Sequence, residues 1–110
     1  MAKLGSTIQL AVMATAAVLE VGGDALIRKG LRGSGVALIG LGVVVLGSYG
    51  LVVNLLDLDF SRLLGAYVGI FAVVSVLAGR ILFRDTVPAT TWWGLGVVLL
   101  GSLIIHLGNR

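Results

Sequence analysis

The sequence predicts an all-α membrane protein of four transmembrane helices, and two observations support this prediction. Of the 110 residues, 58% are hydrophobic and only 12% are charged, with a mean hydropathy of +1.12. A soluble domain has about a quarter of its residues charged, so this chain lacks the polar side chains to cover a water-exposed surface. Its apolar runs, such as 43–46, do not alternate with polar residues as the strands of a membrane barrel do. Helices satisfy their own backbone hydrogen bonds in lipid, so the runs are predicted to be helical.

The first two spans are each followed by a charged stretch. A span needs about 20 residues to cross a hydrocarbon core of roughly 30 Å. The first is predicted at 6–27, before the basic residues of 28–32, and the second at 34–54, before the acidic stretch 57–59. The apolar run of the first span continues past the point where a secretory signal peptide would be cleaved. We therefore interpret it as a retained span.

The third span is predicted at 63–83 and the fourth at 88–107. Pro88 suits the first turn of a helix, because the N–H that proline lacks would have no partner there. The loops between the spans are very short, so consecutive helices are predicted to lie antiparallel. They would pack as a single four-helix domain over residues 1–110.

The charges beside the loops orient the helices only weakly. Cytoplasmic loops of membrane proteins carry an excess of Lys and Arg. Five of these residues flank the first and third loops and three lie on the opposite side of the membrane, which favours both termini outside. The same five-to-three bias is expected of a chain that inserts in both orientations. The five residues beside the first and third loops are Arg28, Lys29, Arg32, Arg80 and Arg84, and the three on the opposite side are Lys3, Arg62 and Arg110.

Glycine is frequent, with 17 residues, and two pairs of glycines are spaced by about two helical turns. Gly40 and Gly47 form one pair and Gly94 and Gly101 the other, so each pair lies on one helix face. Small residues on one face let helix backbones approach closely in lipid. We expect Gly94 and Gly101, next to Ser102, to form the packing face of a homodimer. The alternative is that glycine is simply common in membrane helices.

Glu20 is the residue whose position most requires an explanation. It lies about 14 residues into the first span, or about 21 Å along the helix axis, and therefore within the hydrocarbon. Ionisable residues at such depth usually face a bundle interior or an aqueous cavity. Because loss of hydration disfavours a charged carboxyl, Glu20 is predicted to exchange a proton for a cation. The alternative is a protonated structural glutamate that is hydrogen-bonded to a neighbouring helix.

Asp24 lies one turn after Glu20 and one turn before Arg28, so the three residues share a helix face. Asp24 either forms an interfacial ion pair with Arg28 or points into the same cavity as Glu20. Tyr49 and Tyr67 lie deep in the second and third spans, and either could line that cavity.

Other kinds of chemistry have no support in the sequence. There is no cysteine, so disulfides and thiol chemistry are excluded. No metal-ligand spacing, nucleophile elbow or phosphate-binding loop occurs, so we expect no enzyme activity, metal or cofactor. The net charge of +3 comes without a long basic stretch, so no nucleic-acid partner is expected. His106 and the pair Trp92–Trp93 lie near the ends of the fourth span, where interfacial anchors are typical.

Three motifs extend along the chain. The alanine-rich turn at 14–16 precedes Leu-Glu-Val-Gly at 19–22, which is similar to a first-helix pattern of the small multidrug resistance superfamily. The segment SRLLGAYVG at 61–69 is similar to the third-helix opening of the YnfA-like branch, where Gly-Arg precedes Ala-Tyr-Gly-Gly. The segment 93–105 is similar to the last helix, with its Gly-x6-Gly dimerisation face. The chain thus resembles the small multidrug resistance superfamily, and most of all its YnfA-like branch, over nearly its whole length.

The resemblance implies a proton-coupled exporter of the inner membrane that works as an antiparallel homodimer. In such proteins a first-helix glutamate binds protons and cationic substrate in alternation, and Glu20 matches it. Glu20, Asp24 and Tyr67 are the predicted proton- and substrate-binding residues, although the family usually has a small or polar residue at the position of Asp24. The third helix of characterised members also carries a Trp-Ser-Gly motif, and no tryptophan occurs in this one. An aromatic wall for stacking a cation is therefore absent there, which leaves the identity of the substrate open.

Our leading hypothesis is a multi-pass plasma-membrane exporter of small or amphipathic cations. One alternative is a subunit of a lipid-carrier flippase, which needs no titrating carboxyl and would tolerate Gln in place of Glu20. Another is a structural membrane subunit without transport, which would be purified with a stable partner and would move no protons.

Overall fold

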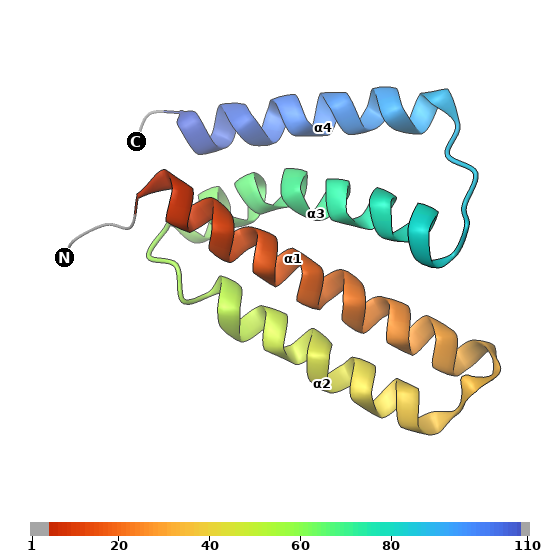
Figure 1. Cartoon of the computed structure of the whole chain (residues 1–110). Helices are drawn as coiled ribbons and strands as arrows, with labels where there is room; N and C mark the ends of the chain where they lie inside the picture. Colours follow the sequence, from red (N-terminus) through yellow and green to blue (C-terminus); the bar gives the residue numbers. More distant parts are fainter. Residues whose placement is uncertain (1–4, 109–110) are drawn as a thin grey trace. The chain divides into compact units, whose positions relative to one another are not determined.

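The structure is a computed structural model that describes residues 5–108. Every regular element in this part of the chain is helical, and four helices are long and apolar enough to cross a membrane (Figure 1). The predicted all-α membrane fold is confirmed. The elements in chain order are α1 (Ser6–Lys29), the π-helical turn η1 (Gly30–Ser34), α2 (Val36–Val53), α3 (Phe60–Leu82) and α4 (Ala89–Leu107).

Two helices extend beyond the spans predicted from hydropathy. α1 continues to Lys29, and the chain turns only at Gly33 and Gly35, whose φ angles are +122° and +106°. α3 begins at Phe60, three residues before the predicted start, and so includes Arg62. Hydropathy identifies the segment that lies in lipid, whereas the hydrogen-bonded helix also continues through charged residues at the membrane boundary.

The chain divides into two compact units, each of which is a helical hairpin. The first unit ends at Asp57 and contains α1, η1 and α2, and the second begins at Leu58 and contains α3 and α4 (Figure 1). The predicted single four-helix domain and the homodimer stay predictions. Lys3 and Arg110, which contribute to the predicted orientation, lie outside the described residues.

Glycines bring the backbones of α1 and α2 into contact. A Cβ atom added to Gly23 would lie 2.7 Å from the backbone nitrogen of Leu46, and one added to Gly42 would lie 2.7 Å from the carbonyl oxygen of Gly23. Cβ atoms do not approach other heavy atoms closer than about 3.0 Å, so a larger residue at either position would push the helices apart. This close approach is the packing that small residues permit in lipid.

The contacts of these glycines also define the register of the first hairpin. Gly23 lies opposite Leu46, Gly42 opposite Ile27, and Gly30 opposite Ile39. Each step forward along α1 is therefore matched by an equal step back along α2. Continuing this register by three residues places Glu20 of α1 opposite Tyr49 of α2.

The second hairpin is joined by the hydroxyl group of Ser102 in α4. This hydroxyl donates to the carbonyl oxygens of Gly65 (2.6 Å) and Ala66 (3.0 Å), and accepts a hydrogen bond from the backbone N–H of Gly69 (2.7 Å). A Cβ on Gly69 would lie 2.6 Å from the Cβ of Ser102, so glycine is needed at this position. A polar side chain of α4 thus binds directly to the backbone of α3.

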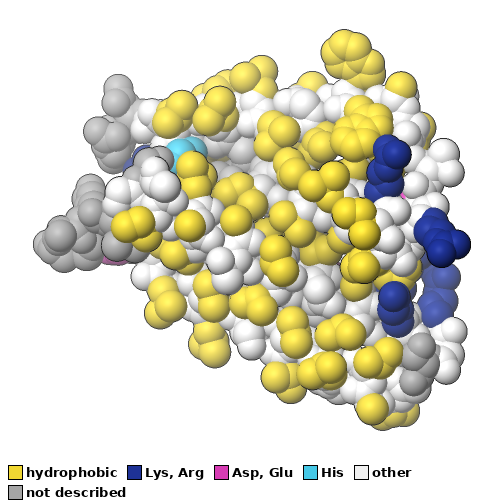
Figure 2. Space-filling view, in the orientation of Figure 1, with side chains coloured by type: hydrophobic (Ala, Val, Ile, Leu, Met, Phe, Trp, Pro, Cys, Tyr) yellow, Lys and Arg dark blue, Asp and Glu magenta, His cyan; other side chains and the backbone are white. Residues whose placement is uncertain are grey.

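Hydrophobic side chains cover much of the visible surface (Figure 2). Val36 of α2 is 82% exposed and Trp93 of α4 is 78% exposed. Such exposure would be unfavourable in water and is expected of helices that face lipid tails.

Candidate functional site

Glu20 and Tyr49 form the centre of the candidate site. Both side chains are partly buried in the first hairpin, and Tyr49 interacts electrostatically with Glu20. The register derived from the glycine contacts independently places the two residues opposite each other. Sequence analysis identified Tyr49 only as a residue that could line a cavity. Its partner could be identified only from the register of the hairpin, which requires the contacts between α1 and α2.

Small residues of α1 lie before and after Glu20 along the helix. Gly23, which contacts α2 directly, follows Glu20 by less than one turn, and Ala16 and Ala17 precede it and are fully buried. Small side chains on both sides of Glu20 allow neighbouring elements to approach its carboxyl group closely. The local sequence therefore places a partly buried ionisable group between short side chains of α1.

Asp24 lies one turn after Glu20 on α1, and its side chain is exposed. The two carboxyl groups thus belong to one helix but differ in their surroundings, since Glu20 is the more buried of the two. A role for Asp24 in binding stays a prediction.

Tyr67, the third predicted binding residue, lies in α3 of the second unit. Its side chain is 4% exposed, and its ring centroid lies 6.2 Å from that of Phe71, with the ring planes tilted by 33°. It therefore has an aromatic neighbour one turn along its own helix. That Tyr67 shares a site with Glu20 stays a prediction.

Gly94 and Gly101, the predicted dimer-packing residues, are exposed on α4. A Cβ added to either glycine would meet no atom within 4 Å. They differ in this from Gly65 and Gly69 of α3, whose added Cβ atoms would collide with side chains of α4. Gly94 and Gly101 are thus not used to pack the second hairpin, and the predicted dimer contact stays a prediction.

Arg62 and His106 were not paired by sequence analysis. In the structure, Nη2 of Arg62, near the start of α3, donates a hydrogen bond of 2.7 Å to the backbone carbonyl of His106, in the last turn of α4. A cation beside the last carbonyls of a helix is favourable, because that end of the helix carries a partial negative charge. His106 is only 7% exposed, so it is more buried than an interfacial anchor would be.

Comparison of the sequence with known proteins places this chain in a family. Residues 6–110 match the sequence model of a family described as "Uncharacterised BCR, YnfA/UPF0060 family". The UPF0060 membrane protein of Nocardia farcinica is 37% identical over 103 residues, which cover 92% of this chain and 93% of the relative. No solved structure matches the chain.

Two further relatives show a similar extent of likeness. The UPF0060 membrane protein of Rhodococcus jostii is 38% identical over 105 residues, covering 92% of this chain and 94% of the relative. The one of Synechocystis sp. is 32% identical over 96 residues, covering 86% and 89%. Because these matches span nearly the full length of both chains, the protein belongs to the YnfA/UPF0060 family of membrane proteins.

Proposed function

We propose that this protein is a proton-coupled secondary transporter of the small multidrug resistance type, which exports small or amphipathic cations across the cell inner membrane. The observation that supports this proposal most strongly is the pair of Glu20 and Tyr49 in the first hairpin. A carboxyl group within a membrane span is costly to keep, and here the register of the hairpin places Tyr49 of the opposite helix beside it, within electrostatic reach. An arrangement of this kind suits a group that changes its charge during function.

In the proposed mechanism, Glu20 binds a proton or a cation but not both. An ionised carboxylate is unfavourable in a poorly hydrated site, so the proton leaves when a cation arrives to balance the negative charge. The Tyr49 hydroxyl can donate a hydrogen bond to the carboxylate and can accept one from the protonated acid. It would hold the carboxyl group in one position through both states. The transport would use the proton gradient alone, without a catalytic residue or cofactor.

A homodimer is the proposed working form. A second copy would shield Glu20 from lipid and enclose a cavity around it, with Asp24 and Tyr67 as further binding residues. Gly94 and Gly101 offer an open stripe on α4 for the contact between copies. Close helix packing over such small residues is a common way for membrane helices to associate.

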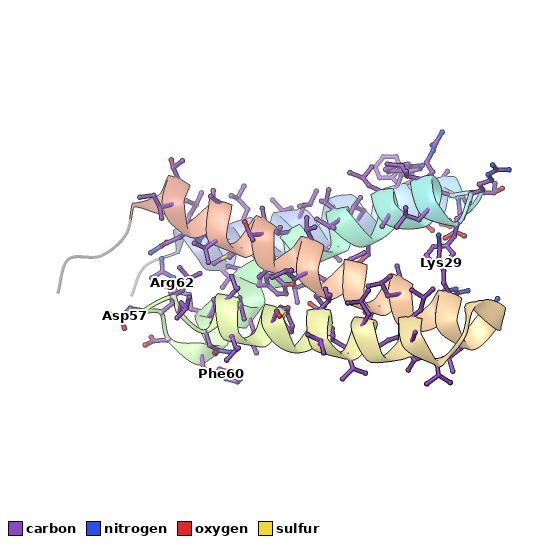
Figure 3. The ribbon with its side chains drawn as sticks, turned by 60° about the horizontal axis from the view of Figure 1, so that its bottom comes forward. Lys29, Asp57, Phe60 and Arg62 are labelled. Carbon is purple, nitrogen blue, oxygen red and sulfur yellow. The ribbon has the colours of Figure 1, made fainter. Side chains whose placement is uncertain are left out.

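The test is current recording on a solid-supported membrane, with purified protein in liposomes and with guanidinium, quaternary ammonium and polyamine compounds as candidate substrates. We expect a proton-linked current with at least one class, and none after Glu20→Gln. Asp57→Asn is the matched control, because it also removes one carboxylate but at an exposed position that points away from the helices (Figure 3). Absence of a current with every class would contradict the proposal, and a current that survives Glu20→Gln would favour a flippase subunit.

A further inference from the structure

The end of the second hairpin contains an open hollow, lined by both polar and apolar side chains, that the proposed transport mechanism does not use. It has a volume of about 360 Å³ and lies between the ends of α3 and α4. One carboxylate, that of Asp85, and three hydroxyl side chains line it, those of Ser75, Thr86 and Thr91. The Ser75 hydroxyl donates to the carbonyl of Phe71 at 2.7 Å, which leaves its oxygen lone pairs able to accept hydrogen bonds from a ligand.

The backbone holds Asp85 in a defined position beside this hollow. Arg84 has a φ of +55°, which is uncommon for a residue other than glycine. This turn directs the N–H of Asp85 to the carbonyl oxygen of Gly79, at 3.0 Å. A Cβ on Gly79 would lie 2.5 Å from Oδ2 of Asp85. The carboxylate therefore rests on the bare Cα of a glycine, and any other residue there would displace it.

No neighbouring side chain among the described residues balances the charge of Asp85. Within residues 5–108 it forms no ion pair, although Arg80 and Arg84 are close in sequence and both are exposed. A single carboxylate with hydroxyl oxygens around it suits a monovalent cation that carries N–H donors. A divalent metal ion is less suited, since it prefers six or more oxygen ligands with several carboxylates.

The remaining wall of the hollow is apolar. Val76 of α3 and Val87 and Pro88 of the loop form this side. A ligand that combines one positive charge with a short alkyl chain could place its charge beside Asp85 and its alkyl chain against this apolar wall. We propose that the hollow binds a small organic monocation, such as an alkylguanidinium or alkylammonium ion, with Asp85 as its charge partner.

This second site is distinct in sequence from Glu20, and binding there does not require transport. It can therefore be tested in full-length Glu20→Gln protein, in which the proposed transport site is disabled. Butylguanidinium would be titrated into the purified protein in detergent micelles, and the backbone amide NMR signals of Thr86 and Thr91 followed. We expect saturable shifts of both signals. No shift of these signals would overturn the proposal without bearing on transport.

Two variants separate the charge of the site from its shape. Asp85→Asn removes the negative charge and is expected to weaken binding about tenfold, which is a change readily measured by titration. Gly79→Ala leaves every charge in place but occupies the position of the carboxylate, so it should also weaken binding. Asp57→Asn, the control, should leave the affinity unchanged. If Asp85→Asn binds the cation as tightly as the parent protein does, the proposal is overturned. If Gly79→Ala binds it as tightly as the parent protein does, Gly79 is not needed to position the Asp85 carboxylate.

Discussion

In the proposed mechanism, the hydroxyl group of Tyr49 positions the carboxyl group of Glu20. Tyr49→Phe keeps the aromatic ring and removes the group that can bind Glu20 in both of its protonation states. We expect the proton-linked current to fall by about 10- to 150-fold, because a hydrogen bond to a charged group contributes about 1.5–3 kcal/mol. Ser48→Ala is the control on the same helix, since the Ser48 hydroxyl donates to the carbonyl of Val44 in its own helix. A wild-type current in Tyr49→Phe would remove Tyr49 from the mechanism.

Competition between proton and cation at Glu20 predicts a definite dependence on pH. Lowering the pH fills the site with protons, so the apparent affinity for the cation should fall, by at most about tenfold per pH unit for each proton displaced. Binding measured across a pH series should lose its pH dependence in Glu20→Gln and keep it, shifted, in Glu20→Asp. If Asp24→Asn abolishes proton release while Glu20→Gln does not, Asp24 is the coupling carboxyl.

The sequence was sufficient to select Glu20 as a candidate residue but not to describe its surroundings. An acidic residue in a long apolar run is conspicuous, because hydropathy alone reveals it. The partner of Glu20 depends on which residues of α2 lie opposite it, and the register is determined by contacts at Gly23 and Gly42 that no spacing rule predicts. The position of the Asp85 carboxylate beside Gly79 likewise depends on the unusual backbone angle of Arg84, which the sequence does not indicate.

The helices themselves were predictable from composition, since length and hydropathy determine which segments can cross a membrane. What the sequence could not distinguish is which glycines pack within a hairpin and which remain open. Gly40 and Gly47 were predicted to share a face on α2, yet an added Cβ at either would meet no atom within 4 Å. Gly42, between them in the chain, makes the backbone contact with α1. The difference arises from helix orientation, which apolar residues on all sides of a helix leave unspecified.

The contact at Gly42 provides a test at the scale of the helices. Gly42→Ala would place a Cβ 2.7 Å from the carbonyl oxygen of Gly23, so α1 and α2 must separate. We expect a destabilisation of about 1–3 kcal/mol, as for overpacked cores, together with reduced transport because Tyr49 moves away from Glu20. Unfolding in mixed detergent micelles measures the first effect. Gly40→Ala, which meets nothing, should change neither quantity, and equal behaviour of the two variants would disprove this contact.

At the scale of the whole molecule, the distribution of charge predicts the orientation of the chain in the membrane. The five-to-three bias of Lys and Arg is small, so we expect insertion in both directions. A topology reporter fused after Arg110 should then be detected on both faces of the membrane. Adding four lysines at the loop 57–59 would give that side seven basic residues against five, which should reverse the bias and enrich one orientation. A C-terminus found strictly on one side in the natural sequence would argue against an antiparallel homodimer.

The open glycines of α4 determine how two copies are predicted to meet. Gly94 and Gly101 lie on one helix face and make no contact within their own hairpin, so a second α4 can approach there closely. Gly101→Leu would fill this stripe and should shift the protein from dimer to monomer in mild detergent, as measured by light scattering and by crosslinking in liposomes. Gly96→Leu is the control, because Gly96 is equally open but lies on a different face of α4. If Gly101→Leu leaves the dimer fraction unchanged, this face of α4 is not part of the interface. If both variants lose the dimer, the interface includes more than one face of α4.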